Sequence, residues 1–322
     1  DELLVALRAP HAYQLTSWLT SNPGDPLPKA MAIPQHGRWV VCGYGRFGGH
    51  LTADLVRSGI PVTVIDERAE ALDGVEVITG DATDPQVLQR ADLGSDVAFA
   101  AATNNDITNL SLLVSAKKAN PRLFTIARQN DPANTPLFDG LPIDSTLLPT
   151  TLIAHEVLAR IGDPLLWAFV QQAQQHTDDW GVALVERITG RCGSERPDIW
   201  TLALTPAGAP ALIPHLEQAT VGGLLHDPQD RTRELDAVVL LLKRGDQILM
   251  TPADDEPLRA DDELLLVGMS YDRRALDTTV SVPTAAEYVL TGDRVGQSWI
   301  WRTLVDRRGA AWNGPAVSGK NR

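Results

Sequence analysis

The chain has 322 residues, of which 43% are apolar and 21% are charged, and its formal net charge is −13. This composition is typical of a globular protein long enough for two domains, and the negative charge repels phosphate backbones, so we expect no nucleic acid partner. The two cysteines, Cys42 and Cys192, form no C-x-x-C pair, so we expect a reducing compartment and a buried, structural Cys42.

The N-terminal segment combines a helical pattern with a proline-rich linker. Residues 1–18 place apolar side chains at helical spacing, although Pro10 interrupts the pattern, and residues 21–28 contain three prolines. Proline restricts both itself and the residue before it, so we expect an extended, semi-rigid linker. The chain starts at Asp1 rather than Met, and no apolar run reaches the ~18 residues of a membrane span. We therefore expect part of a longer polypeptide, whose preceding segment can include a membrane part.

Short apolar strands alternate with helices from residue 37 onward. The pattern predicts helices at residues 48–58, 85–91 and 107–118. It predicts strands at residues 39–43, 62–66, 75–79, 97–101 and 123–127. Such alternation indicates βαβ units with right-handed crossovers, and hence an α/β fold with a Rossmann-like, doubly wound parallel sheet.

A glycine motif joins the first predicted strand to the first helix of this sheet. The motif is Gly43-Tyr44-Gly45-Arg46-Phe47-Gly48. In a G-x-G-x-x-G loop, the first glycine permits the tight turn, the second lets a pyrophosphate approach, and the third lets the helix pack closely. The helix N-terminus then directs unpaired N–H groups at the phosphates. We expect Tyr44, Arg46 and Phe47 to help place them.

An acidic residue completes the pattern of a dinucleotide site. Asp66 ends the second predicted strand, 23 residues after Gly43. A carboxylate there can accept hydrogen bonds from both ribose hydroxyls, and it repels a 2′-phosphate. The sequence therefore favours an adenine nucleotide with an unphosphorylated ribose, NAD/NADH or ATP/ADP, over NADP.

Polar residues also follow the third, fourth and fifth predicted strands. Asp81 and Ala82 follow the third, Thr103 and Asn104 follow the fourth, and Arg128 follows the fifth. The carboxyl ends of parallel strands meet at one edge of the sheet, where such folds bind ligands, so we expect these residues at the same site.

Each of these positions also has a structural interpretation. Asp84 with Pro85 forms an N-cap and first-turn pair, and Asp106 can cap the next helix. Arg128 can reach a phosphate or pair with an acid. The structural and the binding roles remain open from the sequence.

The second half of the chain changes its pattern. Residues 149–170 predict a helix capped by Thr151, a break at Gly162 and Pro164, and a second apolar helix, which suits either a dimer contact or packing within the domain. The pattern then predicts strands at residues 180–189, 199–205, 238–243, 247–250 and 263–267. We expect a small α+β subdomain, followed by a tail that contains Trp299, Trp301 and Trp312.

These motifs together resemble an RCK domain, the regulator of potassium conductance, also called a KTN or Trk-type NAD-binding domain. The resemblance covers residues 37–268 and includes residues 248–268, which are similar to the closing hairpin of the RCK C-terminal subdomain. It implies a cytoplasmic regulatory module at the inner face of the membrane. Such modules dimerise through a helix-turn-helix and assemble into a ring, and nucleotide binding to the ring gates potassium flux. No T-V-G-Y-G filter is present, so the implied pore or Trk-type membrane subunit lies upstream of residue 1 or on another chain.

The resemblance divides the chain into five expected parts. These are an N-terminal helix and linker (1–36), a Rossmann-like domain (37–150), a crossover helix-turn-helix (151–178), a C-terminal subdomain (179–270) and an extension (271–322).

Two alternatives remain open. The first is an NAD-dependent oxidoreductase, which would need a proton donor near the nicotinamide. His50 and His155 fall on predicted helices rather than at strand ends, so we expect no catalytic residue. The second is a divalent-cation-gated sensor with a vestigial nucleotide site. Acidic clusters at residues 254–256 and 261–263 can offer oxygen ligands, but we expect solvated turns there and no metal ligand.

Overall fold

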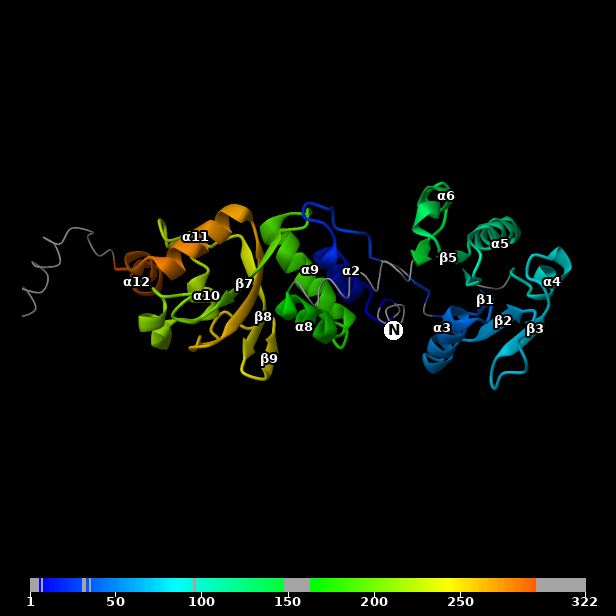
Figure 1. Ribbon diagram of the computed structural model, residues 1–322, viewed down its shortest axis with the longest axis horizontal. Coiled ribbons are helices and arrows are strands. Elements are labelled where there is room, and N and C mark those ends of the chain that lie inside the picture. The colour runs from blue at the N-terminus through cyan, green and yellow to red at the C-terminus, as the bar shows by residue number, and fades with distance from the viewer. Residues whose placement is uncertain are drawn as a thin grey trace, which may run out of the picture. The chain divides into compact units, whose positions relative to one another are not determined.

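The computed structural model describes residue 6 and residues 8–30, 33–34, 36–94, 97–147 and 163–293. The chain divides into two compact units (Figure 1). Unit 1 contains Asp1–Thr189 and Ser194–Arg196, and unit 2 contains Gly190–Gly193 and Pro197–Arg322. Of the helices in the described ranges, none combines the length and the apolar character needed to cross a membrane.

Pro10 interrupts the helical pattern as expected, because Ala6 and Arg8 are helical, Ala9 is not, and the helix α2 starts at Pro10. α2 spans Pro10–Thr20, so the proline begins the helix, where its missing N–H costs no hydrogen bond. Leu15, Trp18 and Leu19 are buried. The linker that follows is fastened to this helix, because Trp18 Nε1 donates to the Asp25 carbonyl at 3.2 Å.

Six parallel strands form the sheet of unit 1, and they confirm the predicted α/β, Rossmann-like fold. The strands are β1 (Trp39–Cys42), β2 (Val62–Asp66), β3 (Glu76–Thr79), β4 (Ala98–Ala101), β5 (Phe124–Arg128) and β6 (Ser145–Leu147). Their order is β3-β2-β1-β4-β5-β6 (Figure 1). The order reverses between β1 and β4, and the carboxyl edge at that point is where open α/β sheets bind ligands. The sequence did not predict β6, since Ser145 and Thr146 give no apolar run.

Helices connect these strands on both faces of the sheet. They are α3 (Arg46–Arg57), α4 (Pro85–Arg90), α5 (Asp106–Ala119), a 3₁₀ turn at Pro132–Asn134, and α6 (Thr135–Asp139).

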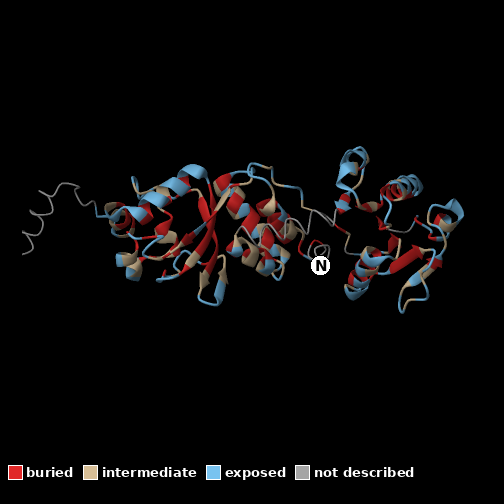
Figure 2. Cartoon of the chain, in the orientation of Figure 1, coloured by how far each residue is buried: buried red, intermediate tan, exposed pale blue. Residues whose placement is uncertain are grey.

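Alternate residues of β1 enter two separate hydrophobic cores. Trp39 and Val41 pack with Leu55 of α3, whereas Val40 and Cys42 pack with Leu112 of α5. The central strands β1, β2 and β4 are therefore buried on both faces, whereas the edge strand β3 is partly exposed (Figure 2). Cys42 is fully buried, as expected, and burial raises the pKa of its thiol.

Two further helices of the chain correct the predicted strand at residues 180–189. Those residues lie within α9 (Asp178–Cys192), which follows α8 (Pro164–Ala173). Leu184, Val185 and Ile188 are buried at helical spacing, although their branched side chains also suit a strand. Gly181 lets α9 approach α2, because a Cβ there would lie 2.5 Å from the backbone nitrogen of Ala12. The predicted helix that begins at Thr151, and the break at Gly162, lie outside the described residues.

Unit 2 contains a four-stranded antiparallel sheet, which confirms the expected small α+β subdomain. The strands are β7 (Asp198–Ala203), β8 (Ala237–Arg244), β9 (Gln247–Met250) and β10 (Glu263–Gly268), in the order β7-β10-β8-β9. The helical elements are a 3₁₀ segment (Ile213–Gln218), α10 (Val221–Leu224), α11 (Ser270–Ser281) and α12 (Pro283–Thr291). The sequence analysis did not predict α11 or α12. The three tail tryptophans lie outside the described residues.

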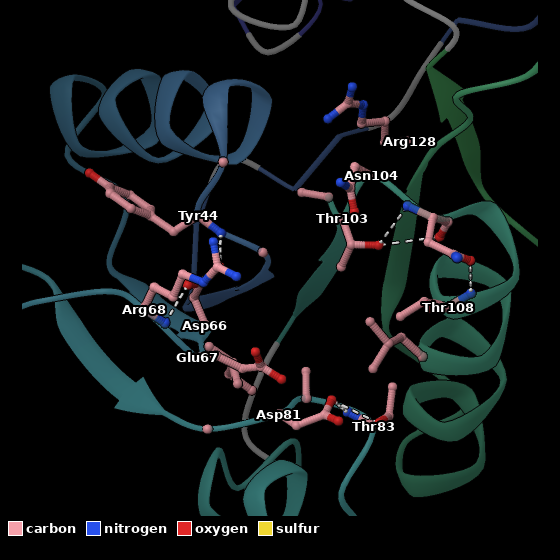
Figure 3. A pocket seen from close by; sticks show the side chains of 18 of the residues that line it. Tyr44, Asp66, Glu67, Arg68, Asp81, Thr83, Thr103, Asn104, Thr108 and Arg128 are labelled. Atoms are coloured by element: carbon pink, nitrogen blue, oxygen red, sulfur yellow. Dashed lines mark hydrogen bonds between the residues drawn. The ribbon is translucent and has the colours of Figure 1, made fainter.

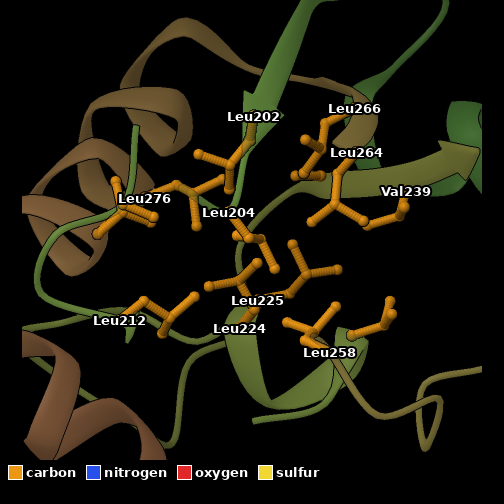
Figure 4. Packing of buried hydrophobic residues seen from close by; sticks show 14 of the residues in the cluster. Leu202, Leu204, Leu212, Leu224, Leu225, Val239, Leu258, Leu264, Leu266 and Leu276 are labelled. Atoms are coloured by element: carbon orange, nitrogen blue, oxygen red, sulfur yellow. The ribbon is translucent and has the colours of Figure 1, made fainter. Parts of the chain in front are cut away.

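Leucines dominate the core of unit 2. Leu202, Leu264 and Leu266 extend from the sheet and pack against Leu224 of α10 and Leu276 of α11 (Figure 4). All five are buried. β8 is apolar at successive positions because both of its faces are covered.

The acidic residues near the closing hairpin were expected to lie in solvated turns, but one of them, Asp262, is instead buried in an ion pair. Asp262 is 0% exposed, and its two carboxylate oxygens accept from Nε and Nη2 of Arg244 at 2.9 and 2.8 Å. Glu256 also pairs with Arg244. In the described parts of the chain, no group of three His, Cys, Asp or Glu side chains is placed to hold a metal ion. Arg244 therefore forms an ion pair with one acid of each predicted cluster, Glu256 and Asp262.

Candidate functional site

Close packing requires glycine at Gly43 and Gly48 of the motif, but not at Gly45. Gly43 has φ +96°, and a Cβ there would lie 3.0 Å from the backbone nitrogen of Thr103. A Cβ at Gly48 would lie 1.8 Å from the Gly43 carbonyl oxygen. Gly45 has φ −76°, which any residue adopts, and a Cβ there would meet nothing within 4 Å. Nothing in the described fold explains Gly45, so a molecule that approaches the loop is its best explanation.

The N-terminus of α3 opens at this glycine. Gly45 is the N-cap residue and supplies no side-chain hydrogen bond to the first turn. The first-turn N–H groups of a helix have no partner within the helix, and together with the helix dipole they attract anions. A phosphate would find both the donors and the space here.

Asp66 lies where the sequence placed it, at the end of β2 beside the glycine loop. Its Oδ2 accepts from the backbone N–H of Tyr44 at 2.7 Å, and its Oδ1 accepts from that of Arg68 at 2.8 Å (Figure 3). Each carboxylate oxygen has further capacity to accept a hydrogen bond. Asp66 therefore holds the glycine loop in place and can still accept hydrogen bonds from the hydroxyl groups of a ligand.

The loop after β3 forms another wall. Asp81 Oδ1 accepts from the backbone N–H and the hydroxyl of Thr83 at 2.8 and 2.7 Å, and these hydrogen bonds hold the pKa of Asp81 below its usual range. The structural interpretation of Asp84 is also confirmed, since it caps α4 by accepting from the N–H of Gln86 at 2.8 Å.

The loop after β4 corrects the capping role proposed for Asp106. Asn105 is the N-cap of α5, and its side chain accepts from the N–H of Thr108 at 3.0 Å. Asp106 is instead buried and accepts from the backbone N–H groups of Asn130 and Asp131, at 2.7 and 3.0 Å. It also accepts from the side-chain amides of Asn130 and Asn134, both at 2.8 Å. Asp106 therefore holds the loop that follows β5.

The acid stability of unit 1 tests the role of Asp106. Burial acts to raise the pKa of Asp106, but the hydrogen bonds outweigh burial and hold the pKa below its usual range. A depressed pKa adds stability above the unfolded-state value of about 3.9, and this stability is lost as pH falls through the folded-state value. We expect Asp106→Asn to be less stable near neutral pH and the deficit to shrink below about pH 4. Urea unfolding of the wild-type chain and of Asp106→Asn between about pH 7 and pH 3 measures this difference in stability. A difference that does not change with pH would contradict the role of Asp106.

Arg128 ends β5 and faces the same space as the loops (Figure 3). Its guanidinium lies 5.6 Å from the centre of the Phe47 ring, and its Nε is buried without a hydrogen-bond partner. Within the described ranges no acid forms an ion pair with Arg128. Of the two roles left open for this residue, pairing with an acid is therefore not observed.

These loops enclose a cavity of about 700 Å³. Every predicted site residue lines it except Phe47, which packs below Arg128, and Gly48, which packs against the glycine turn. The other lining residues were not predicted from the sequence; they are Ile65, Glu67, Arg68, Gly80, Thr83, Ala102, Asn105, Thr108 and Leu112. Most of these adjoin predicted residues in the sequence. Thr108 and Leu112 are four residues apart on α5, and that spacing could have identified them.

Comparisons with known proteins agree with this architecture. Residues 39–149 match the TrkA-N domain family. The chain is 33% identical over 137 residues to the Trk system potassium uptake protein TrkA homolog of Pyrococcus horikoshii, a match that covers 39% of this chain and 60% of the relative. It is 29% identical over 240 residues to the Trk system potassium uptake protein TrkA of Mycobacterium tuberculosis, covering 71% of this chain and 92% of that protein.

Similarity extends to a channel and to a solved structure. Potassium channel protein 1 of Methanocaldococcus jannaschii is 23% identical over 154 residues, which cover 46% of each chain. The crystal structure of the GsuK RCK domain aligns with 79% of this chain and 48% of its own, at 20% identity and a TM-score of 0.36. The chain spans 60% of the length of the two Pyrococcus relatives that it matches.

Proposed function

We propose that this chain is an RCK/TrkA-type module that regulates potassium transport by sensing an adenine nucleotide; the match of residues 39–149 to the TrkA-N domain family supports this. The relatives are named as potassium uptake and potassium channel proteins. The observation that carries the nucleotide assignment is the empty space at Gly45, beside the uncapped N-terminus of α3. A packing role explains the other two glycines of the motif but not this one.

Each part of the cavity suits one part of such a ligand. The first turn of α3 and the side chains of Arg46 and Arg128 would hold the phosphates. Asp66 would accept the ribose hydroxyls, and Asp81 and Ala82 would flank the adenine. The cavity volume, about 700 Å³, is within the usual range for small-molecule sites.

The charges that line the cavity suit a ligand that has both phosphates and a free ribose. Three arginines line it, Arg46, Arg68 and Arg128, and none of them forms an ion pair with a described residue. Three acids, Asp66, Glu67 and Asp81, line it as well, so the formal charges balance; the arginines would meet the phosphates and Asp66 the ribose. The carboxylate of Asp66 would repel a 2′-phosphate, so the ligand is NAD/NADH or ATP/ADP rather than NADP.

The proposed mechanism is a shift between conformations. A nucleotide that binds one conformation of a regulatory ring more tightly than another moves the equilibrium by that difference in affinity and by no more. The ring would consist of copies of this chain. It would act on a potassium channel pore or a Trk-type subunit at the cytoplasmic face of the membrane, on the same polypeptide or on another. The protein would bind the nucleotide without converting it.

Replacing Asp66 tests the assignment of the ribose site. We expect Asp66→Ala to fold and to bind ADP or NAD about 100-fold more weakly, because two charge-assisted hydrogen bonds are lost. Calorimetric titration measures the affinity, and thermal unfolding checks that the loop held by Asp66 survives.

Glu67→Ala provides the matched control. It removes the same charge from the adjacent residue of the lining, whose side chain is exposed, and we expect an affinity within about threefold of wild type. If Asp66→Ala binds as tightly as the control, then Asp66 does not bind the ribose.

A further inference from the structure

The side chain of Asn109 is fully buried beneath the cavity, at 0% exposure on α5. It does not line the cavity. Its Oδ1 accepts from the backbone N–H of Thr103 at 3.0 Å and from the Thr103 hydroxyl at 2.6 Å. Its Nδ2 donates to the backbone carbonyls of Thr103 at 3.1 Å and Arg128 at 2.7 Å. A primary amide can donate twice, and the two lone pairs of its oxygen can accept twice, so the full capacity of this side chain is used.

This arrangement connects two strand ends that are distant in the sequence. Thr103 follows β4, and Arg128 ends β5. The pairing of the two strands ends at Ala101 and Ala127, so the amide bridges the residues just beyond the last pair. Without it, the part-buried N–H of Thr103 and carbonyl of Arg128 would lose this partner, which is unfavourable, whereas the Thr103 carbonyl would keep the side chain of Asn130.

The bridge also reaches the glycine loop. The backbone nitrogen of Thr103, which donates to Asn109, lies 3.0 Å from where a Cβ of Gly43 would be. The glycine turn therefore rests on the backbone that Asn109 holds. Because protein interiors are close-packed, a shift of the Thr103 backbone toward the glycine turn would push that turn out of its position.

We propose that Asn109 is a positioning residue, which sets the glycine turn and the Arg128 backbone at the separation that a nucleotide phosphate requires. This inference rests on the proposed function of the cavity. Asn109 would not touch the ligand. It would act through Arg128, whose guanidinium is free of ion pairs with described residues, and through the Thr103 backbone.

A second buried polar side chain, on the strand that Arg128 ends, supplies the control. Thr125 is 0% exposed on β5, and its N–H and hydroxyl donate to Asp144 at 2.8 and 2.7 Å. It lies three residues before Arg128 and does not line the cavity. Asn109→Leu and Thr125→Val both replace a buried polar side chain by an apolar one of similar size without adding charge. The first substitution removes the hydrogen bonds to Thr103 and Arg128, and the second removes the hydroxyl hydrogen bond to Asp144.

The test measures the affinity of the full chain for ADP and for NAD by calorimetry at a temperature where every variant is folded. We expect Asn109→Leu to weaken the tighter of these two probes by about tenfold or more, and Thr125→Val to leave it within about twofold. Asn109→Ser, which is smaller and offers a hydroxyl in place of the amide, serves if the leucine variant does not fold, with the same direction of change.

A double-mutant cycle separates positioning from simple destabilisation. If Asn109 acts through Arg128, then Arg128→Gln will weaken binding strongly in the wild-type chain and by less than about threefold in the Asn109 variant. Additive losses, or an Asn109 variant that binds as tightly as wild type, would overturn the inference while leaving the proposed function intact. A wild-type chain that binds neither probe would overturn both.

Discussion

Alanine at Gly45 should weaken nucleotide binding strongly and leave the fold intact, whereas alanine at Gly48 should destabilise unit 1. A Cβ at Gly45 meets no atom of the protein, so the expected loss of stability is only that of alanine in place of glycine at an N-cap, about 1 kcal/mol or less. The same methyl group would occupy the space through which a phosphate approaches the α3 N-terminus, and we expect at least about a 30-fold loss of affinity. A Cβ at Gly48 would lie 1.8 Å from the Gly43 carbonyl, which forces the loop and helix apart and costs about 3 kcal/mol or more.

Gly190→Ala is a matched control for this pair. Gly190 lies in α9, a Cβ there also meets nothing within 4 Å, and it is not among the residues that line the cavity. Alanine is the better helix former by about 1 kcal/mol, so this variant should be as stable as wild type or more so, with unchanged affinity. Urea unfolding and calorimetric titration of all three variants decide the matter. If Gly45→Ala binds nucleotide as wild type does, then the space at Gly45 is not a phosphate site.

Replacing Arg244 by methionine should destabilise unit 2 by about 3–5 kcal/mol, because Asp262 would remain as a buried carboxylate without its partner. Both oxygens of that carboxylate accept from Arg244, and Asp262 is 0% exposed. The neighbouring pair of Lys243 with Glu263 has side-chain exposures of 37% and 40%. Lys243→Met should therefore cost less than about 1 kcal/mol.

A further variant separates the lost pair from lost packing. Adding Asp262→Leu to Arg244→Met removes the orphaned charge, and we expect it to recover most of the stability. The free energy of unfolding in urea measures all of these variants. Equal losses for Arg244→Met and Lys243→Met would show that the buried pair does not stabilise unit 2.

The sheet of unit 1 could be predicted from the sequence because its strands are short and apolar and its turns carry specific residues. Trp39 to Cys42 are buried on alternating faces, and the glycine motif and Asp66 mark where the chain turns. Each local signal agrees with the global fold, which makes the topology predictable. The acidic residues at strand ends were placed correctly for the same reason.

α9 could not be predicted because its local signal was ambiguous. Val185, Ile188 and Thr189 are β-branched and read as a strand, and Gly181 weakens a helix by its intrinsic propensity. The packing of this helix against α2 decides its conformation, and residues 10–20 and 178–192 are far apart in the sequence. Tertiary contacts of this kind override propensity.

The candidate site was predictable only where single residues carry a known role. Arg68 and Thr83 line the cavity through loop geometry that spacing does not specify. Asn109 was not predicted, because its four hydrogen bonds depend on Thr103 and Arg128 meeting at one edge of the sheet. Asp262 read as a solvated acid because its partner, Arg244, lies 18 residues away on another strand.

Calorimetric titration of the full chain with NAD, NADH, ATP, ADP and NADP, with each mixture also assayed for conversion of the nucleotide, tests whether this cavity is a nucleotide sensor. We expect saturable binding of a nucleotide with an unphosphorylated ribose, weaker binding of NADP, and recovery of the ligand unchanged. Tighter binding of NADP would contradict the role of Asp66. Turnover of the nucleotide would favour the oxidoreductase alternative, and absence of binding would contradict the sensor proposed for this cavity.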